Sequence, residues 1–129
     1  MKSGKSYILA AVYNGSRFNS PNDLVIDEKG RIYFTDPRYL GPEMIEQNGM
    51  NVYRIDSDGS VHLAAANVAK PNGLVLSPDQ QTLYVANSDF PGNGRPGFRL
   101  KKVRFGQPVK ALFMRTMLSR MERCSSARN

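Results

Sequence analysis

Two asparagines, Asn22 and Asn72, occupy the same place in two similar turns, Pro21–Leu24 and Pro71–Leu74. An amide oxygen is a neutral, hard ligand that suits calcium and is acceptable to other divalent ions. The same residue type also stabilises a turn through a hydrogen bond from its own side chain, especially next to proline. The pattern alone therefore leaves two interpretations open, a ligand-binding residue and a turn-forming residue, and it favours the second.

The two turns belong to an internal repeat with a period of 50 residues, whose copies run over 20–36 and 70–88. Each copy contains short β-prone runs separated by turn residues, at about four strands per repeat, which is typical of a β-propeller blade. The predicted strands are Leu24–Ile26, Arg31–Thr35, Asn51–Ile55, Val61–Ala65, Leu74–Leu76 and Thr82–Ala86, with Tyr7–Tyr13 as a lead-in strand. We therefore predict an all-β fold, a partial β-propeller of about two blades over residues 1–89, followed by an irregular basic C-terminal tail.

The charge of the chain is divided unevenly between these two parts. The formal net charge is +7, yet residues 90–129 contain a single acid, Glu122, and most of the excess Lys and Arg. Basic arms that bind nucleic acid show this asymmetry, but the tail offers few aromatic residues among its basic ones, so we do not expect a nucleic-acid partner. No apolar run approaches the roughly 20 residues that span a bilayer, so we expect no membrane partner. The absence of a clear signal peptide slightly favours a cytoplasmic location.

Residues 90–129 are interpreted as a segment that is not native to the fold. Back-translation of residues 114–123, begun at the last base of the Met114 codon, permits a peptide that contains Pro-Asp-Gly. That tripeptide would fall about one blade after Asn72. A shift of reading frame is therefore our hypothesis for the tail, and an evolved basic tail is the alternative.

Five motifs, in a fixed order and spacing, resemble one known family. They are Arg17–Val25, Ile32–Tyr39, Val52–Asp56, Lys70–Asp79 and Thr82–Ser88. Over about residues 16–89 the chain resembles the regucalcin–gluconolactonase–luciferin-regenerating (senescence marker protein) family. The resemblance implies a six-bladed propeller with one divalent ion, calcium or zinc, near its axis. It also implies an enzyme that hydrolyses a sugar lactone by attack of metal-activated water.

The resemblance also assigns roles to the two asparagines. It implies that Asn72 is a metal ligand and that Asn22 lies near the metal and contacts the metal-bound water or the substrate. The two acidic ligands of the family are a first-blade Glu, which would precede Met1, and the Asp of a Pro-Asp-Gly turn, which does not occur in this sequence. That Asp is also the general base of the family, so no catalytic residue is identified here.

Neutral amides alone cannot balance a divalent ion or take a proton from water. We therefore expect this chain to bind metal weakly and to lack lactonase activity, as a fragment of a metal-dependent lactonase. The alternative function is a non-enzymatic, propeller-derived binding module. Because blades need neighbours on both faces, we also expect self-association through open blade edges.

Three further polar residues are weaker candidates. Asp36 either contacts the substrate at the mouth of the propeller or ends a strand at a turn, and the sequence favours neither. Asp23 is expected to stabilise its own turn. The single histidine, His62, lies in a predicted strand, where a packed or solvated side chain is favoured over a catalytic base.

Overall fold

The computed structural model describes residues 4–39, 41–42, 44–66, 68–88 and 99–104. Every regular element in these residues is a β-strand. Since the described residues form no helix, none of them lies in a helix able to span a membrane. The strands are β1 (Val12–Tyr13), β2 (Ser16–Arg17), β3 (Leu24–Ile26), β4 (Ile32–Asp36), β5 (Asn51–Ile55), β6 (Val61–Ala65), β7 (Pro71–Leu76), β8 (Thr82–Asn87) and β9 (Arg99–Arg104).

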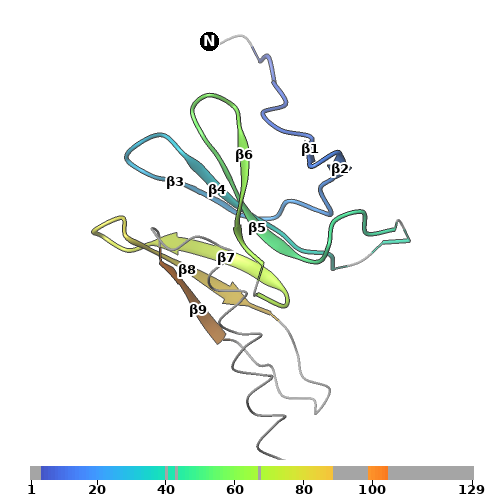
Figure 1. Cartoon of the computed structure of the whole chain (residues 1–129). Coiled ribbons are helices and arrows are strands. Elements are labelled where there is room, and N and C mark those ends of the chain that lie inside the picture. Colours follow the sequence, from blue (N-terminus) through green and yellow to red (C-terminus); the bar gives the residue numbers. More distant parts are fainter. Residues whose placement is uncertain (1–3, 40, 43, 67, 89–98, 105–129) are drawn as a thin grey trace, which may run out of the picture.

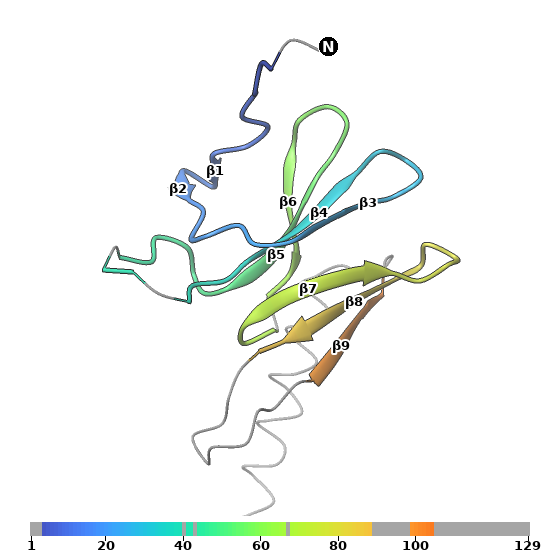
Figure 2. The same ribbon diagram turned by 180° about the vertical axis from the view of Figure 1, so that it is seen from behind.

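Two antiparallel sheets account for most of these strands (Figure 1). The first blade has the order β3-β4-β5-β6 and the second blade has the order β7-β8-β9, while β1 and β2 form a short ribbon. Within each blade, paired strands are consecutive in sequence, which is the meander of a propeller blade. Figures 1 and 2 show the second blade on one side of the first and the N-terminal segment on the other side. The fold is a partial β-propeller, as predicted.

The strand alternation of β4 separates two apolar clusters, one on each face of the first blade. Tyr33 points toward the second blade and lies in a cluster with Val52, Leu83 and Val85, all four fully buried. Phe34 points the opposite way and packs in a second cluster, with Tyr53 and Ile55 among its buried members. Tyr33 and Phe34 therefore lie on opposite faces of the sheet, because successive side chains of a strand alternate.

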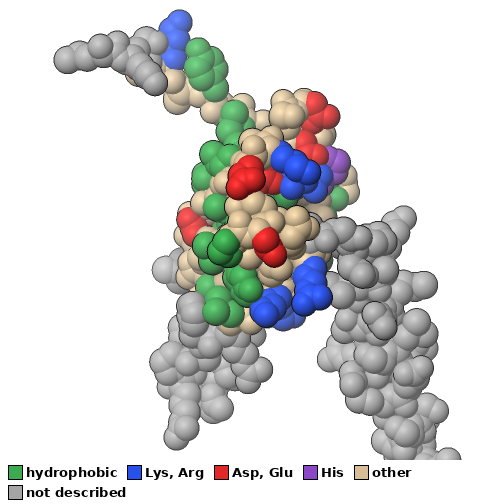
Figure 3. Space-filling model, turned by 90° about the vertical axis from the view of Figure 1, so that its left-hand side faces the viewer, with side chains coloured by type: hydrophobic (Ala, Val, Ile, Leu, Met, Phe, Trp, Pro, Cys, Tyr) green, Lys and Arg blue, Asp and Glu red, His purple; other side chains and the backbone are tan. Residues whose placement is uncertain are grey.

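The outer face of the first blade, on the Phe34 side, is covered only in part. Phe18 packs edge-on against both Phe34 and Tyr53, with ring centroids 5.1 Å apart in each pair. Leu24 and Ile26 on the same sheet remain 59% and 57% exposed. An apolar groove of about 310 Å³ lies along this face beneath the N-terminal segment. In the view of Figure 3 apolar side chains follow one edge of the molecule beside clusters of charged ones.

The lead-in strand predicted over Tyr7–Tyr13 is wrong for most of its length. Only Val12 and Tyr13 are in a strand, paired with Ser16 and Arg17. An extended segment becomes a strand only where another backbone satisfies its N–H and C=O groups. Within the lead-in segment, the described residues provide such a partner for β1 alone. Tyr7–Leu9 therefore form a loop although they are apolar, and Ile8 is 84% exposed.

The prediction that the strand pattern ends at Asp89 is wrong for β9, which lies inside the predicted irregular tail. β9 pairs with β8 along its whole length, from Asn87 opposite Arg99 to Thr82 opposite Arg104. The cause is the free edge of β8, which offers backbone partners to a basic segment. Val103 joins the buried cluster, and the Lys102 ammonium lies 5.5 Å from the centre of the Tyr84 ring, a favourable cation–π contact.

The remaining tail, residues 90–98 and 105–129, lies outside the described residues. The segment on which the reading-frame hypothesis depends, 114–123, is within it. That hypothesis therefore stays a prediction.

Candidate functional site at the paired Pro-Asn turns

The two repeated turns meet where β3 and β7 begin. The Nδ2 atom of Asn22 donates a hydrogen bond to Oδ1 of Asn72 at 2.8 Å, so the two amides lie on the same side of the molecule. Backbone bonds hold the first turn, because the Asn22 N–H donates to the Thr35 carbonyl at 2.9 Å and the Thr35 N–H donates to the Asp23 carbonyl at 3.0 Å. The side chain of Asn22 is exposed and that of Asn72 is half-buried.

Asn72 has a second side-chain partner. Its Nδ2 atom donates to Oγ of Ser88 at 3.0 Å. Ser88 comes directly after the last residue of β8, and its own N–H donates to the Lys70 carbonyl at 2.8 Å. The amide of Asn72 is therefore held at its oxygen end by Asn22 from the first blade and at its nitrogen end by Ser88 from the second.

Asp23 connects the same two turns through its carboxylate. One oxygen accepts from the Leu24 N–H at 2.9 Å, within its own turn, as expected from the sequence. The other accepts from the Leu74 N–H at 3.1 Å, in the second turn. Gly73 stands beside this contact, and a Cβ atom there would lie 3.7 Å from the Asp23 carboxylate, an ordinary contact distance. Asp23 therefore also ties the second turn to the first.

Asp36 is fully buried, and both of its carboxylate oxygens accept backbone hydrogen bonds. Oδ2 accepts from the Asn19 N–H at 2.9 Å and Oδ1 from the Ser20 N–H at 2.8 Å. Burial raises the pKa of the Asp36 carboxyl above its ordinary value, although these two bonds act in the opposite direction. Of the two roles left open by the sequence, this position favours the strand-ending anchor over a substrate contact.

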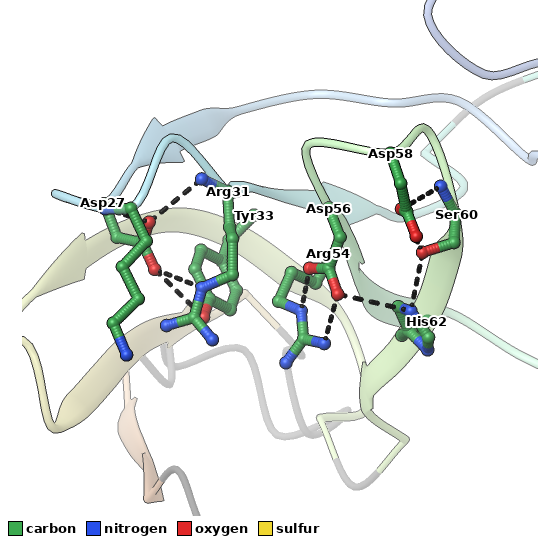
Figure 4. A network of polar contacts seen from close by, with 9 residues as sticks. Asp27, Arg31, Tyr33, Arg54, Asp56, Asp58, Ser60 and His62 are labelled. Atoms are coloured by element: carbon green, nitrogen blue, oxygen red, sulfur yellow. Dashed lines mark hydrogen bonds and ion pairs between the residues drawn. The ribbon is translucent and has the colours of Figure 1, made fainter.

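His62 belongs to a polar network at the other end of the first blade (Figure 4). Its Nε2 atom lies 2.9 Å from Oγ of Ser60 and 3.3 Å from Oδ2 of Asp56. A Ser-His-Asp triad needs the carboxylate on the other ring nitrogen, and here both contacts involve Nε2. With its side chain 49% exposed and its backbone in β6, His62 has the environment expected of a solvated strand residue.

The same network contains two arginine–aspartate pairs. Arg31 Nε lies 2.6 Å from Oδ2 of the buried Asp27, and Arg54 Nε lies 2.6 Å from Oδ1 of Asp56. Burial raises the pKa of Asp27, but hydrogen bonds from the Arg31 backbone and side chain and from the Lys29 N–H outweigh it, and the pKa is lowered. Figure 4 shows both pairs alongside Tyr33, near the hairpin turns of the first blade.

The donor set at the paired turns does not fit a divalent ion without further ligands. Among the described residues, no group of three or more His, Cys, Asp and Glu side chains could hold a metal ion. Asn22 and Asn72 provide neutral oxygens. The nearest carboxylate in the turns, Asp23, already uses both oxygens on backbone N–H groups, and a hard divalent ion normally requires carboxylate ligands.

Two residues with structural importance near the turns were not identified from sequence. One is Ser88, which closes the second copy of the repeat and could have been found only by considering the residue after its last strand. The other is Gln47, whose Nε2 atom donates to the Tyr13, Ser16 and Arg17 carbonyls at 3.3, 2.7 and 3.1 Å. No spacing in the loop over 37–49 indicates that role.

The sheets and the paired turns together define part of a β-propeller whose repeats bring asparagines to one end. Residues 1–90 match the sequence model described as the SMP-30/gluconolactonase/LRE-like region. The chain belongs to this family, as the five motifs predicted.

Three comparisons place the chain among gluconolactonase-like proteins. It is 48% identical over 82 residues to a gluconolactonase of Zymomonas mobilis, covering 60% of this chain and 23% of that protein. It is 36% identical over 90 residues to a lactonohydrolase of Aspergillus oryzae, covering 66% of this chain and 21% of that protein. A solved gluconolactonase structure from Xanthomonas campestris superposes with a TM-score of 0.68 and 36% identity, over 83% of this chain and 36% of that one. The chain thus spans about a quarter or less of the length of these two curated relatives.

Proposed function

We propose that this chain carries part of the site of a lactonase that hydrolyses a sugar lactone, and that it is inactive alone. The observation that carries the proposal is the 2.8 Å contact between the amides of Asn22 and Asn72. It brings together the two residues to which the family resemblance gives roles at the metal and the substrate. The names of the two curated relatives, a gluconolactonase and a lactonohydrolase, support the lactone as the substrate class.

The proposed metal is calcium or zinc, with Asn72 as a ligand and Asn22 beside it. When bound, such an ion would polarise the lactone carbonyl and lower the pKa of a bound water. The described residues supply neither the negative charge to retain the ion nor an unengaged carboxylate near the amides to take a proton. Inactivity of the isolated chain is the consequence of this shortage. For Asp36 the proposed role is to anchor the loop at Asn19 and Ser20 rather than to bind substrate.

The first test is hydrolysis of a sugar δ-lactone by the purified chain, with and without added calcium or zinc. We expect no turnover above the spontaneous rate under either condition. Metal-dependent turnover that disappears in Asn72→Ala would overturn the proposed inactivity and would mean that Asp23, or a residue outside the described ones, completes the site.

The second test asks whether this segment can serve in a complete lactonase. Residues 1–90 would replace the matching segment of the Zymomonas mobilis gluconolactonase, to which the alignment is 48% identical. We expect the chimera to hydrolyse lactone and its Asn72→Ala variant to lose turnover. The control is Ser57→Ala, at an exposed position in the β5–β6 hairpin of the same segment. A folded chimera with unchanged turnover after Asn72→Ala would refute the assignment of Asn72.

We further propose that the propeller part and the tail over 105–129 are separate in origin, with the shift of reading frame as its cause. Sequencing of the gene through codons 85–129 in independent clones tests this proposal. The nucleotides are read in all three frames, and the absence of Pro-Asp-Gly from both shifted frames of this stretch would exclude the proposal.

Self-association is proposed for the isolated chain because of the outer face of the first blade. Leu24 and Ile26 are mostly exposed there beside the apolar groove, and uncovered apolar surface of this kind promotes association. Sedimentation at increasing concentration tests it, with Leu24→Lys expected to reduce association. A monodisperse monomer at all concentrations would refute it.

The alternative function is a binding module without enzymatic activity. In that case the paired amides would bind a ligand, and lactone would not be hydrolysed even in the chimera. A chimera that folds and retains metal but never turns over lactone would favour this alternative.

A further inference from the structure

Ser88 is the third member of a hydrogen-bonded unit that crosses from one blade to the other. Asn22 Nδ2 donates to Asn72 Oδ1 at 2.8 Å, and Asn72 Nδ2 donates to Ser88 Oγ at 3.0 Å. The position of Ser88 is itself fixed, because its N–H donates to the Lys70 carbonyl at 2.8 Å just before the second turn. The unit therefore rests on backbone at the Ser88 end.

The amide of an asparagine needs two restraints to be held in one orientation. Its terminal torsion is broad and roughly two-fold, so one hydrogen bond at one end leaves the amide plane free to turn. In this structure Asn22 restrains the oxygen end of Asn72 and Ser88 restrains the nitrogen end. Without Ser88, the half-buried Nδ2 of Asn72 would lose the acceptor that the described residues give it.

We propose that Ser88 is a positioning residue for Asn72 and, through Asn72, for Asn22. The carbonyl oxygen of an amide has two lone pairs, and Asn22 engages one of those on Asn72. Ser88 keeps the second lone pair of the Asn72 oxygen in a constant direction. A ligand that offers a hydroxyl hydrogen, such as a sugar lactone, or a hard cation could then use it. This inference rests on the proposed function insofar as Asn72 contributes to a lactonase site.

The test uses the full chain and the side-chain amide resonances of Asn72 and Asn22, measured by ¹⁵N–¹H NMR without lactone or metal. In Ser88→Ala we expect the Nδ2 hydrogens of Asn72 to exchange with water about tenfold faster, because one hydrogen bond of about 1.4 kcal/mol is lost. The Asn22 side-chain resonances should shift as well. Ser88→Thr, which retains the hydroxyl, should restore the wild-type signals.

Ser60→Ala is the matched control, since Ser60 also bonds through its hydroxyl but lies in the β5–β6 hairpin. It should leave both amides unchanged. Unaltered Asn72 signals in Ser88→Ala would overturn the proposal, and so would equal changes in Ser88→Thr.

A parallel measurement separates this inference from the proposed function. In the lactonase chimera, Ser88→Ala should lower turnover by about 10-fold to 100-fold, the range for residues that orient a metal ligand, and Ser88→Thr should recover it. If the NMR changes occur but the chimera with Ser88 intact never turns over lactone, the positioning role stands and the proposed function fails. Unchanged turnover in Ser88→Ala of an active chimera would overturn the role of Ser88 in the site.

Discussion

The two repeats anchor the loop before each Pro-Asn turn at the same place but with different chemistry. In the first repeat the carboxylate of Asp36, at the end of β4, accepts the N–H groups of Asn19 and Ser20. In the second repeat the equivalent residue, Asn87 at the end of β8, accepts the Lys70 N–H through Oδ1 at 2.9 Å. An acidic acceptor and a neutral one therefore hold equivalent loops.

The hairpin turns at the other end both contain a carboxylate, but at different positions. Asp27 accepts the N–H groups of Lys29 and Arg31 and pairs with the Arg31 guanidinium. Its counterpart Ser77 accepts the Thr82 N–H at 2.9 Å through a neutral hydroxyl. That hydroxyl donates to the carboxylate of Asp79, which also accepts the Gln81 N–H. In both turns the closing backbone bond is 2.9 Å, from Gly30 to the Asp27 carbonyl and from Gln80 to the Ser77 carbonyl.

At the strand ends the blade therefore needs a hydrogen-bond acceptor and does not need a charge. The carboxylates of the first repeat add hydrogen bonds and an ion pair, and they couple its stability to pH. In the second repeat the carboxylate of Asp79, whose pKa is lowered by the hydrogen bond from the Ser77 hydroxyl, couples stability to pH in the same way.

The largest expected difference between the repeats is at the strand-end anchors. Asp36→Ala leaves the Asn19 and Ser20 N–H groups without their acceptor and should destabilise the chain by about 2–4 kcal/mol. Asn87→Ala removes the acceptor of the Lys70 N–H and should cost about 1–2 kcal/mol. Denaturant unfolding of both variants at one protein concentration measures the difference. Equal losses would contradict the unequal division between the repeats.

At the hairpin turns, Asp27→Asn should destabilise the chain by about 1–3 kcal/mol at pH 7, because it removes the charge that pairs with Arg31 in a buried position. The pKa of Asp27 is lowered from 3.8 in the folded chain, so its stabilisation is present above that value and is lost as pH falls through the lowered pKa. The effect of Asp27→Asn should therefore vanish in acid. Asn87→Ala, which removes a neutral acceptor of the second repeat, is the control, and its effect should not depend on pH in this way.

A titration of opposite sign is expected for Asp36. Its pKa is raised from 3.8 in the folded chain, so the stability linked to its protonation is complete below 3.8 and is lost as pH rises through the raised pKa. Asp36→Asn reproduces the neutral acceptor of the second repeat and should remove this dependence. At pH 7 it should lower the free energy of unfolding by about 1–2 kcal/mol, because one of the two N–H groups loses its acceptor. Thermal unfolding from pH 3 to pH 8 measures the slopes. A variant that keeps the wild-type slope would show that another group titrates.

Much of the fold was predictable because it depends on local patterns. The 50-residue repeat and the alternation around Tyr33 and Phe34 predicted the blades and their two faces. β9 was not predicted, since its basic residues lack strand periodicity and its formation depends on the free edge of β8. The lead-in strand failed for the opposite reason, because apolar residues at Tyr7–Leu9 had no backbone partner among the described residues.

Only the part of the site that follows from the internal repeat was predictable from the sequence. Equivalent positions of successive blades converge, so the meeting of Asn22 and Asn72 was implied by their spacing. The second contact of Asp23, with the Leu74 N–H, depends on how closely the blades approach, which no spacing encodes. Ser88 and Gln47 act through single hydrogen-bond geometries that appear only once the turns are placed in space.

The smallest expected effect concerns the third position of the hairpin turns, where the backbone is left-handed in both repeats. Gly30 has φ of 76° and Gln80 has φ of 58°. Glycine adopts this region without steric penalty, whereas for other residues it costs about 1–2 kcal/mol, and glycine loses part of that advantage through the greater freedom of the unfolded chain. Gln80→Gly should therefore stabilise the chain by about 0.5–1 kcal/mol, helped by removal of a buried Oε1 without a hydrogen-bond partner in the described residues.

Gly30→Ala should destabilise the chain by a similar amount, although no atom lies within 4 Å of the added Cβ, because the penalty comes from the backbone. Denaturant midpoints of the two variants measure both changes in stability. A loss of stability in Gln80→Gly would mean that the contacts of the Gln80 side chain contribute more free energy than its left-handed backbone costs.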